Sequence, residues 1–398
     1  MPGDKVSIGD LSRKDWVINM TEQRILTADH EYADLDRYLQ ELEAKKLFLV
    51  CGRSIQKLRL NEYIETLGQR LGIDVVRFSG FHPNPDYDSA AEGTRLFRES
   101  GADLIMAVGG GSALDVAKCI KLYANMDPDQ NYLKQKIVPN EIPLLAVPTT
   151  SGTGSEATRF AVIYYQGVKQ SVADESIIPS AVLIDPSVIH TLPDYHRKAT
   201  MMDAFCHAVE SIWSVNSNET SRKYAKEALT LILENQEGYL NNEDAANAAM
   251  LRAANLAGKA INITQTTAGH AMAYKLTSLY GVAHGHAAAL CVSRLWPYML
   301  EHPEPCADPR GQAYVRGVFD ELAAVMQADT PQAGAAKFRA ILDGLDLPQP
   351  QASEADYEVL RTSVNPDRLK NNPVRLDEET IERLYRDILS DGGQTGRE

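Results

Sequence analysis

A change in the spacing of apolar residues near position 190 is the feature that most constrains how this chain folds. Before it, four short apolar runs alternate with amphipathic segments, at residues 46–52, 73–80, 102–111 and 142–150. Continuous apolar runs separated by helices are typical of a parallel sheet covered on both faces. We expect 61–72 and 89–101 to be two of the covering helices. The first part therefore predicts an α/β domain of the nucleotide-binding type.

Beyond residue 190 the pattern is helical to the C-terminus. Segments such as 221–240 and 243–262 are rich in Ala, Leu and Glu, with apolar residues at helical spacing. No repeat, low-complexity tract or flexible linker interrupts the chain. We therefore expect a Rossmann-like domain over residues 1–190 and an all-helical domain over residues 191–398, packed closely enough to enclose a cleft.

Composition excludes several classes of partner. The net charge of −14 argues against nucleic acid, because neutralising phosphates needs clustered Lys and Arg. No basic amphipathic run favours a membrane surface, and residues 1–16 lack the apolar core of a signal peptide. The five cysteines are widely spaced and form no CxxC pair, a pattern of reducing compartments. We expect a cytoplasmic protein that acts on a small molecule.

Two loops rich in small residues indicate a phosphate-binding edge. VGGGSALDVAK, residues 108–118, follows an apolar run and opens a helical one, so its backbone N–H groups can approach an anion. It is not the GxGxxG fingerprint, and a turn that binds nothing remains an alternative. PTTSGTGSEAT, residues 148–158, is a second such loop. Two of them at the ends of neighbouring strands favour a dinucleotide.

One acidic and three basic side chains form a candidate metal set. Asp203 and His207 are four residues apart, so a helix places them on one face. A hydrogen-bonded surface pair is the alternative, but apolar neighbours indicate burial, which is costly for an unpaired carboxylate. His270 and His284 can supply two further donors. Such a set suits Fe(II) or Zn(II), with one position open for substrate.

Together these motifs resemble the iron-containing, group III alcohol dehydrogenases along almost the whole chain. GGGSALDVAK, PTTSGTGSEAT, DAFCH and HAMAYKLTSLYGVAH are the segments that match. The resemblance implies the dehydroquinate synthase-like fold, NAD(P) in the cleft, and a metal held by Asp203, His207, His270 and His284. It also implies cofactor contacts at Asn84, Gly109, Gly110, Gly111, Ser112, Asp115, Thr149, Thr150, Ser155 and Lys169.

The chain departs from that family at two places. Members that prefer NAD have an Asp at the end of the second strand, where this chain has Gly52, followed by Arg53 and Ser54. Without that carboxylate a 2′-phosphate is not repelled, and Arg53 can pair with it, so we expect NADPH to serve at least as well as NADH. Many members also have a His four residues after the first His of HAMAYK. Tyr274 stands there, which leaves solvent, Tyr274 or His286 as the proton donor.

The run from 270 to 286 is especially similar to phosphonoacetaldehyde reductases, which make 2-hydroxyethylphosphonate. Lys275, together with Arg159, would neutralise a phosphonate tail. The alternatives are that Lys275 points to solvent and that Arg159 forms a structural ion pair.

We therefore expect a metal-dependent, NAD(P)H-linked reductase of phosphonoacetaldehyde, acting as a homodimer. Reductases of sulfoacetaldehyde or of short uncharged aldehydes are the nearest alternatives. A lyase of the dehydroquinate synthase type shares the fold but uses NAD only transiently, so net consumption of NAD(P)H would exclude it. A non-catalytic nucleotide-binding protein is disfavoured by the four-donor metal set.

Overall fold

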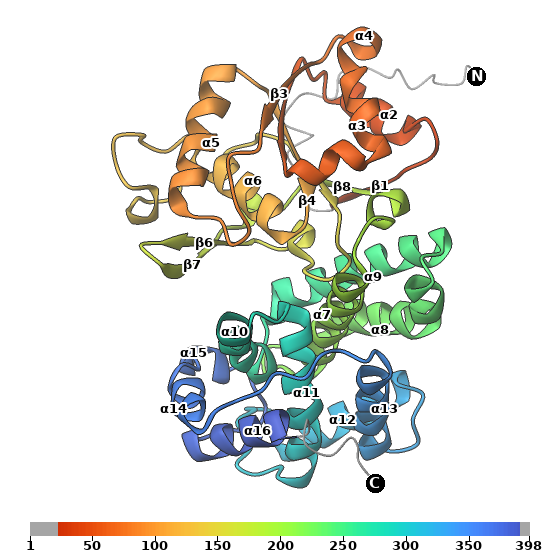
Figure 1. Cartoon of the computed structure of the whole chain (residues 1–398), viewed down its shortest axis with the longest axis vertical. Helices are drawn as coiled ribbons and strands as arrows, with labels where there is room; N and C mark the ends of the chain where they lie inside the picture. The colour runs from red at the N-terminus through yellow and green to blue at the C-terminus, as the bar shows by residue number, and fades with distance from the viewer. Residues whose placement is uncertain (1–22, 391–398) are drawn as a thin grey trace, which may run out of the picture.

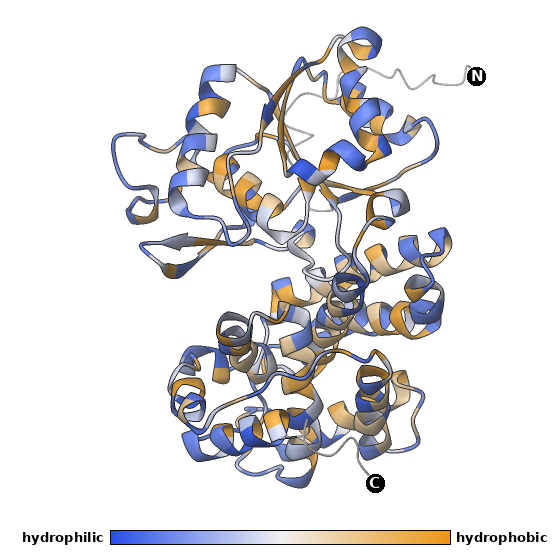
Figure 2. Ribbon diagram, in the orientation of Figure 1, coloured by the Kyte–Doolittle hydropathy of each residue, from blue (hydrophilic) through white to orange (hydrophobic). Residues whose placement is uncertain are grey.

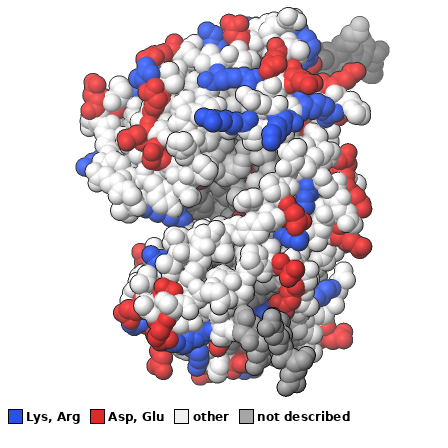
Figure 3. Space-filling view, viewed as in Figure 1, with Lys and Arg blue, Asp and Glu red and all other residues white. Residues whose placement is uncertain are grey.

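The computed structural model describes residues 23–390 of the chain. In this part an α/β lobe precedes a helical lobe, and the surface is deeply hollowed between the two (Figures 1 and 3). The stretch without a signal-peptide pattern, residues 1–16, lies outside the described range. Within that range, no helix combines the length and apolar character needed to span a bilayer.

The α/β lobe is built on one six-stranded sheet in which every pair of neighbours is parallel. Its spatial order is β1-β8-β5-β4-β2-β3, so the chain moves outward from β2 to β3 and then returns to the other side of β2 with β4. Open sheets bind ligands at their carboxyl edge, near such a reversal. The strands are β1 (Arg24–Thr27), β2 (Lys46–Cys51), β3 (Asp74–Phe78), β4 (Leu104–Gly109), β5 (Leu144–Pro148) and β8 (Ala181–Ile184).

The central strands are apolar because both of their faces are covered. Nearly every side chain of β2, β4 and β5 is buried, and the sheet is the most hydrophobic part of this lobe (Figure 2). Helix α6 (Gly111–Tyr123) packs against these three strands and is itself buried along most of its length. The other helices of the lobe are α2 (Ala33–Glu41), α3 (Arg59–Glu65), α4 (Leu67–Leu71) and α5 (Tyr87–Ser100).

The four predicted runs are confirmed as β2, β3, β4 and β5, and the predicted α/β class is correct. The expected helix over 61–72 is instead two short helices, because Thr66 interrupts it. Both the backbone N–H and the hydroxyl of Thr66 bond to the carbonyl oxygen of Tyr63. The antiparallel hairpin of β6 (Phe160–Tyr165) and β7 (Val168–Ala173) was not predicted, and it turns at Gln166 and Gly167, which both have positive φ.

The second lobe is helical throughout its described residues, as predicted. Helix α7 lies at its centre and packs against α8, α9 and α11, which explains why nearly all of its residues from Met201 onward are buried, the charged ones included. We propose the domain boundary at residue 190, just before α7. The helices are α7 (Asp194–Trp213), α8 (Glu219–Leu240), α9 (Asp244–Thr264), α10 (Ala268–Tyr280), α11 (His284–Glu301), α12 (Gln312–Val325), α13 (Pro331–Gly344), α14 (Glu354–Thr362), α15 (Pro366–Leu369) and α16 (Glu378–Ser390).

Hydrogen bonds join the two lobes at the base of the hollow. The backbone N–H of Arg159 donates to the side-chain oxygen of Asn262 on α9, over 2.8 Å. The hydroxyls of Ser151, just after β5, and Tyr239 on α8 are 2.6 Å apart. Because both contacts start from the loop region after β5, the carboxyl edge of the sheet is fixed against the helical lobe.

Candidate active site

The glycine-rich loop after β4 leaves a helix N-terminus open at the carboxyl edge of the sheet. Strand β4 ends at Gly109, Gly110 is the N-cap residue, and α6 begins at Gly111. No side chain caps this end, so the first N–H groups of α6 are available to an anion. Thr149, just after β5, donates its N–H to the Gly109 carbonyl over 3.0 Å. The two predicted cofactor loops therefore lie side by side.

The buried side chain of Lys118 forms hydrogen bonds with the loop after β5. Ser155 donates its hydroxyl to Asp115 over 2.8 Å, and the Nζ of Lys118 donates to the hydroxyls of Ser155 and Thr158 over 3.0 and 3.1 Å. Burial lowers the pKa of Lys118 to about 8. Lys118 was not predicted from the sequence to take part in this site. Its position three residues after Asp115, on the same face of a helix, indicates that the two side chains can reach the same loop. Asp115 and Ser155 thus hold the loop, and their contacts with the cofactor stay a prediction.

The remaining predicted cofactor residues surround the same edge. The N–H of Asn84, a residue with φ 57°, donates to the hydroxyl of Ser112 over 3.3 Å. Gly52 directly follows β2 and is the N-cap of the short 3₁₀ helix Arg53–Lys57. The side chains of Arg53 and Ser54 are exposed there. The end of β2 therefore has space for a charged group of the cofactor, at the position where an enzyme that prefers NAD has a carboxylate.

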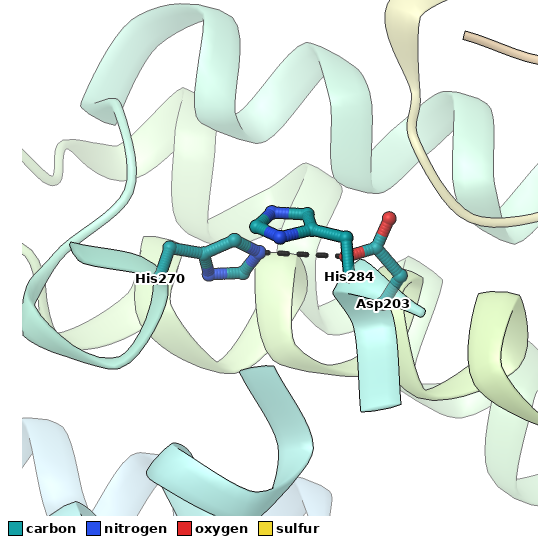
Figure 4. A group of neighbouring side chains, drawn as sticks. All are labelled: Asp203, His270 and His284. Atoms are coloured by element: carbon teal, nitrogen blue, oxygen red, sulfur yellow. Dashed lines mark ion pairs between the residues drawn. The ribbon is translucent and has the colours of Figure 1, made fainter. Parts of the chain in front are cut away.

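Three of the four predicted metal ligands come together in the helical lobe. Asp203 extends from α7, His270 from α10 and His284 from the first residue of α11 (Figure 4). One potential ligand atom from each lies within 4.8 Å of the others. The Nε2 atom of His270 is 3.5 Å from Oδ1 of Asp203. The two atoms form an ion pair, and their separation also allows both to bind one cation placed between them.

His207 lies beside this group without being part of it. Its imidazole is parallel to that of His270, with the ring centroids 4.4 Å apart. Its Nδ1 is 3.2 Å from the carbonyl oxygen of Gly152. Because a carbonyl can only accept, Nδ1 carries the proton and Nε2 keeps its lone pair. The structure thus leaves His207 in the tautomer that a metal ligand needs.

Glu210 fixes the orientation of His270, and the sequence argument missed it. Its fully buried carboxylate accepts from Nδ1 of His270, from the backbone N–H of the same residue, and from the hydroxyl of Thr267. A carboxylate on one ring nitrogen leaves the other free for a metal and makes it more basic. Glu210 lies three residues after His207 and seven after Asp203, so the helical spacing of α7 was the available signal.

Two glycines allow the ligand helices to approach so closely. A Cβ atom on Gly285, next to His284, would lie 2.1 Å from the carbonyl oxygen of Ala199 on α7. A Cβ atom on Gly269, next to His270, would lie 2.7 Å from the Glu210 carboxylate. Any larger residue at either place would push α10 or α11 away from α7.

The electrostatics of the site favour a bound cation. Burial disfavours the charge on Asp203, but the surrounding imidazoles, that of His207 foremost, hold its pKa below the usual range. Burial lowers the pKa of His207 to about 4 and that of His284 to about 3, so both rings are neutral at pH 7. Burial also opposes a charge on His270, yet the carboxylates of Glu210 and Asp203 outweigh it and raise the pKa of that ring.

Unpaired atoms show that a metal fits this cluster. Oδ1 of Asp203 and Nε2 of His270 are buried and have no hydrogen-bond partner. Buried polar atoms without partners are rare and costly, and here both point toward the same space (Figure 4). A divalent first-row ion would satisfy both, because carboxylate and imidazole are its ordinary ligands.

The two predicted proton donors lie in different places. The ring of Tyr274 is parallel to that of His284, with centroids 5.1 Å apart, and the Nζ of Lys169 is 3.5 Å from its centroid. His286 is buried and its Nδ1 is 3.2 Å from the hydroxyl of Tyr195. Only Tyr274 therefore contacts a predicted ligand directly.

The two predicted substrate cations also differ in setting. Lys275 is half-buried on α10, five residues after His270 and so on another side of that helix. Arg159 forms an ion pair with Glu175 at 2.6 Å and lies over the ring of Phe160. This favours the structural role that we gave as the alternative for Arg159, while the role of Lys275 stays a prediction.

Comparison with known proteins connects both lobes to one family. A model described as iron-containing alcohol dehydrogenase matches residues 22–186. A second model, for the C-terminal part of the Fe-containing alcohol dehydrogenase family, matches residues 198–389. The first match ends before α7 and the second begins within it, so the boundary between the two matches lies close to the boundary between the lobes.

Individual relatives agree with these matches. The chain is 34% identical to phosphonoacetaldehyde reductase of Streptomyces viridochromogenes, over 75% of this chain and 79% of that protein. It is 30% identical to 1,3-propanediol dehydrogenase of Klebsiella pneumoniae, over 87% and 92% of the two chains. The structure of sulfoacetaldehyde reductase from Bifidobacterium kashiwanohense has the same fold, with a TM-score of 0.81 at 22% identity over 93% of this chain and 97% of that one.

The family matches extend over nearly the whole described chain, and the Asp–His cluster lies within the part that the C-terminal family model matches. This chain therefore belongs to the iron-containing alcohol dehydrogenase family, and it is a metal-dependent, NAD-linked enzyme that interconverts alcohols and aldehydes.

Proposed function

We propose that the enzyme reduces phosphonoacetaldehyde to 2-hydroxyethylphosphonate, taking a hydride from NADPH or NADH and one proton. The observation that supports this substrate is the 34% identity to a phosphonoacetaldehyde reductase over three quarters of the chain. The similarity of residues 270–286 to that kind of enzyme points the same way. The five free thiols support a cytoplasmic location.

We propose Asp203, His207, His270 and His284 as the ligands of one divalent ion, such as Fe(II) or Zn(II). When bound, the metal supplies a Lewis acid and the nicotinamide supplies the hydride. The chain itself provides the geometry. Glu210 holds His270 in one orientation, and the loops after β4 and β5 offer N–H groups to the cofactor phosphates.

We propose Tyr274 as the source of the proton. Its ring contacts that of His284, so its position is fixed relative to the ligand cluster. The Nδ1 of His286, by contrast, is 3.2 Å from the hydroxyl of Tyr195 on α7 and so already has a hydrogen-bond partner. We therefore favour Tyr274 over His286 as the residue that delivers a proton to the substrate oxygen.

Replacing a ligand tests the proposed metal site. His284→Ala should lose bound metal and turnover together, because it removes one donor from a buried cluster that has no spare ligand among the described residues. Metal content by elemental analysis and reductase activity are measured on the same sample, with circular dichroism to verify the fold. His302→Ala is the matched control, because His302 is an exposed histidine at the C-terminal end of the same helix, and it should retain both. Full metal content in His284→Ala would contradict the assignment.

Adding a carboxylate at the end of β2 tests the cofactor preference. Wild-type enzyme should have a kcat/KM for NADPH at least equal to that for NADH. Gly52→Asp should shift the ratio of the two kcat/KM values toward NADH by about 10- to 100-fold. This is the effect of gaining or losing one charge-assisted contact, because about 1.4 kcal/mol corresponds to a tenfold change. Gln56→Asp adds the same charge at an exposed position of the next turn and should leave the ratio nearly unchanged. A wild-type enzyme that strongly prefers NADH would refute the inference.

A panel of aldehydes tests the substrate. Purified, metal-loaded enzyme is given phosphonoacetaldehyde, sulfoacetaldehyde and propanal in turn, and consumption of NADPH and NADH is followed separately. We expect the highest kcat/KM for phosphonoacetaldehyde. A preference for sulfoacetaldehyde or propanal would assign the enzyme to one of the alternatives, and turnover without net loss of reduced cofactor would indicate a lyase.

A further inference from the structure

Helix α7 carries a row of four side chains that lie three or four residues apart and therefore share one side of the helix. The members of this row are Asp203, His207, Glu210 and Trp213. The first three belong to the ligand cluster or orient it. Trp213, the last residue of α7, has no role in the site described so far, although it is 1% exposed. A buried indole N–H usually needs a hydrogen-bond partner.

The partner of Trp213 is Thr267, the N-cap residue of α10. The Nε1 of Trp213 donates to Oγ1 of Thr267 over 2.9 Å, and Oγ1 in turn donates to Oε1 of Glu210 over 2.7 Å. An indole N–H can only donate, so the hydroxyl that accepts from it keeps its single proton for Glu210. All three side chains are buried. The two hydrogen bonds therefore run in one direction, toward the carboxylate.

Thr267 does not cap its own helix. A threonine at an N-cap usually accepts from the backbone N–H two or three residues later, but α10 has no such side-chain cap. The N–H of His270, three residues later, donates instead to Oε1 of Glu210 over 3.2 Å. The other carboxylate oxygen accepts from Nδ1 of the His270 ring. One side chain from α7 therefore holds both the backbone and the ring of a proposed metal ligand.

The chain enters α10 through a strained residue. Gln265, directly after α9, has φ 57° and ψ 172°, a region that residues other than glycine rarely occupy. The carbonyl oxygen of Thr264, before it, accepts from the hydroxyl of Ser214 over 3.1 Å. The carbonyl oxygen of Thr266, after it, accepts from the side chain of Asn371 over 3.0 Å. Because strain persists only where surrounding contacts enforce it, the start of α10 is fixed in place.

We propose that Thr267 is a positioning residue for the metal site. Its hydroxyl, directed by the N–H of Trp213, holds the Glu210 carboxylate in the plane from which that carboxylate orients His270. This inference rests on the proposed ligand set, because the effect of Thr267 reaches the metal through His270. The dashed line in Figure 4 runs from the other ring nitrogen, Nε2, to Asp203, so a tilt of the ring changes the separation of these two donors.

The Thr267 hydroxyl makes the shorter of the two hydrogen bonds to Oε1 of Glu210. Without it, Oε1 keeps only the 3.2 Å bond from the backbone N–H of His270, so the carboxylate can rotate about its last side-chain bond and the ring can follow. The direct partner of a metal-bound histidine changes metal affinity by about 10- to 100-fold. A group that acts through that partner should have a smaller effect, about 3- to 10-fold.

The affinity of metal-free enzyme for Zn(II), measured by competition with a chromogenic chelator, tests this role. Thr267→Val keeps the branched shape and removes the hydroxyl, so its Kd should rise about 3- to 10-fold. Thr267→Ser restores the hydroxyl and should return most of the lost affinity. Trp296→Phe is the matched control, because it removes an indole N–H that has no partner among the described residues, from a ring packed against Trp213. Its Kd should equal that of the wild type.

A double variant separates positioning from a general loss of packing. If Thr267 acts through Glu210, Thr267→Val should weaken metal binding no further in a Glu210→Gln background, because residues of one hydrogen-bond network do not act additively. A loss in the double variant equal to the product of the two single losses would overturn the proposal. Equal Kd values for wild type and Thr267→Val would overturn it as well.

A spectroscopic measurement covers the case in which Thr267→Val fails to fold. Trp213→Phe keeps a packed ring but removes the donor that directs the Thr267 hydroxyl, and bound Co(II) reports the ligand geometry through its d–d absorption. We expect an altered band in Trp213→Phe and an unaltered one in Trp296→Phe. Identical spectra for wild type and Trp213→Phe would overturn the positioning role.

Failure of the positioning role is distinguishable from failure of the ligand assignment. If the wild type binds neither Zn(II) nor Co(II), or if His284→Ala binds them equally well, the ligand set fails and this proposal fails with it. If the wild type binds both ions, His284→Ala binds neither and Thr267→Val binds as the wild type does, only the positioning role fails.

Discussion

The buried carboxylate of Asp203, which among the described residues is compensated only by histidines, is the constraint around which the helical lobe is arranged. Asp203 is 3% exposed and Glu210, nearly two turns further along α7, is fully buried. Carboxylates at such depth are unfavourable unless positive charge or several hydrogen bonds compensate. Glu210 has three donors, whereas Oδ1 of Asp203 has none. The missing charge is what a divalent ion supplies.

The helical lobe places three helices, α7, α10 and α11, around Asp203. The central helix α7 provides Asp203, while α10 and α11 provide one histidine each from their first turns. Gly269 and Gly285 permit the close approach. The carbonyl of Gly152, in the loop after β5, contacts His207, so the cofactor edge of the sheet and the ligand cluster are joined through a single hydrogen bond.

The sequence predicts the parts of this arrangement that local patterns determine. Apolar runs ending in glycine or threonine correctly indicate β2 to β5, and the helical spacing of Asp203 and His207 correctly indicates one face of a helix. What it misses depends on tertiary packing. Glu210 and Lys118 are ordinary charged residues in the sequence, and only the meeting of distant segments gives each a buried, hydrogen-bonded environment. Arg159 shows the converse, because its partner Glu175 comes from the short 3₁₀ helix Glu175–Ile177 after β7, a segment that no local pattern predicted.

The most direct test of this account is the thermal stability of metal-free enzyme titrated with Zn(II), or with Fe(II) under anaerobic conditions, for wild type and for Glu210→Gln. Binding to the folded state alone should raise Tm with metal concentration, corresponding to about 2.7 kcal/mol at a hundred times Kd. Glu210→Gln keeps the shape of the side chain but weakens its hold on His270, so its titration should be displaced to about 10- to 100-fold higher metal. No metal-dependent rise in the wild type, or identical titrations for the two proteins, would contradict the claim that the buried cluster is a cation site oriented by Glu210.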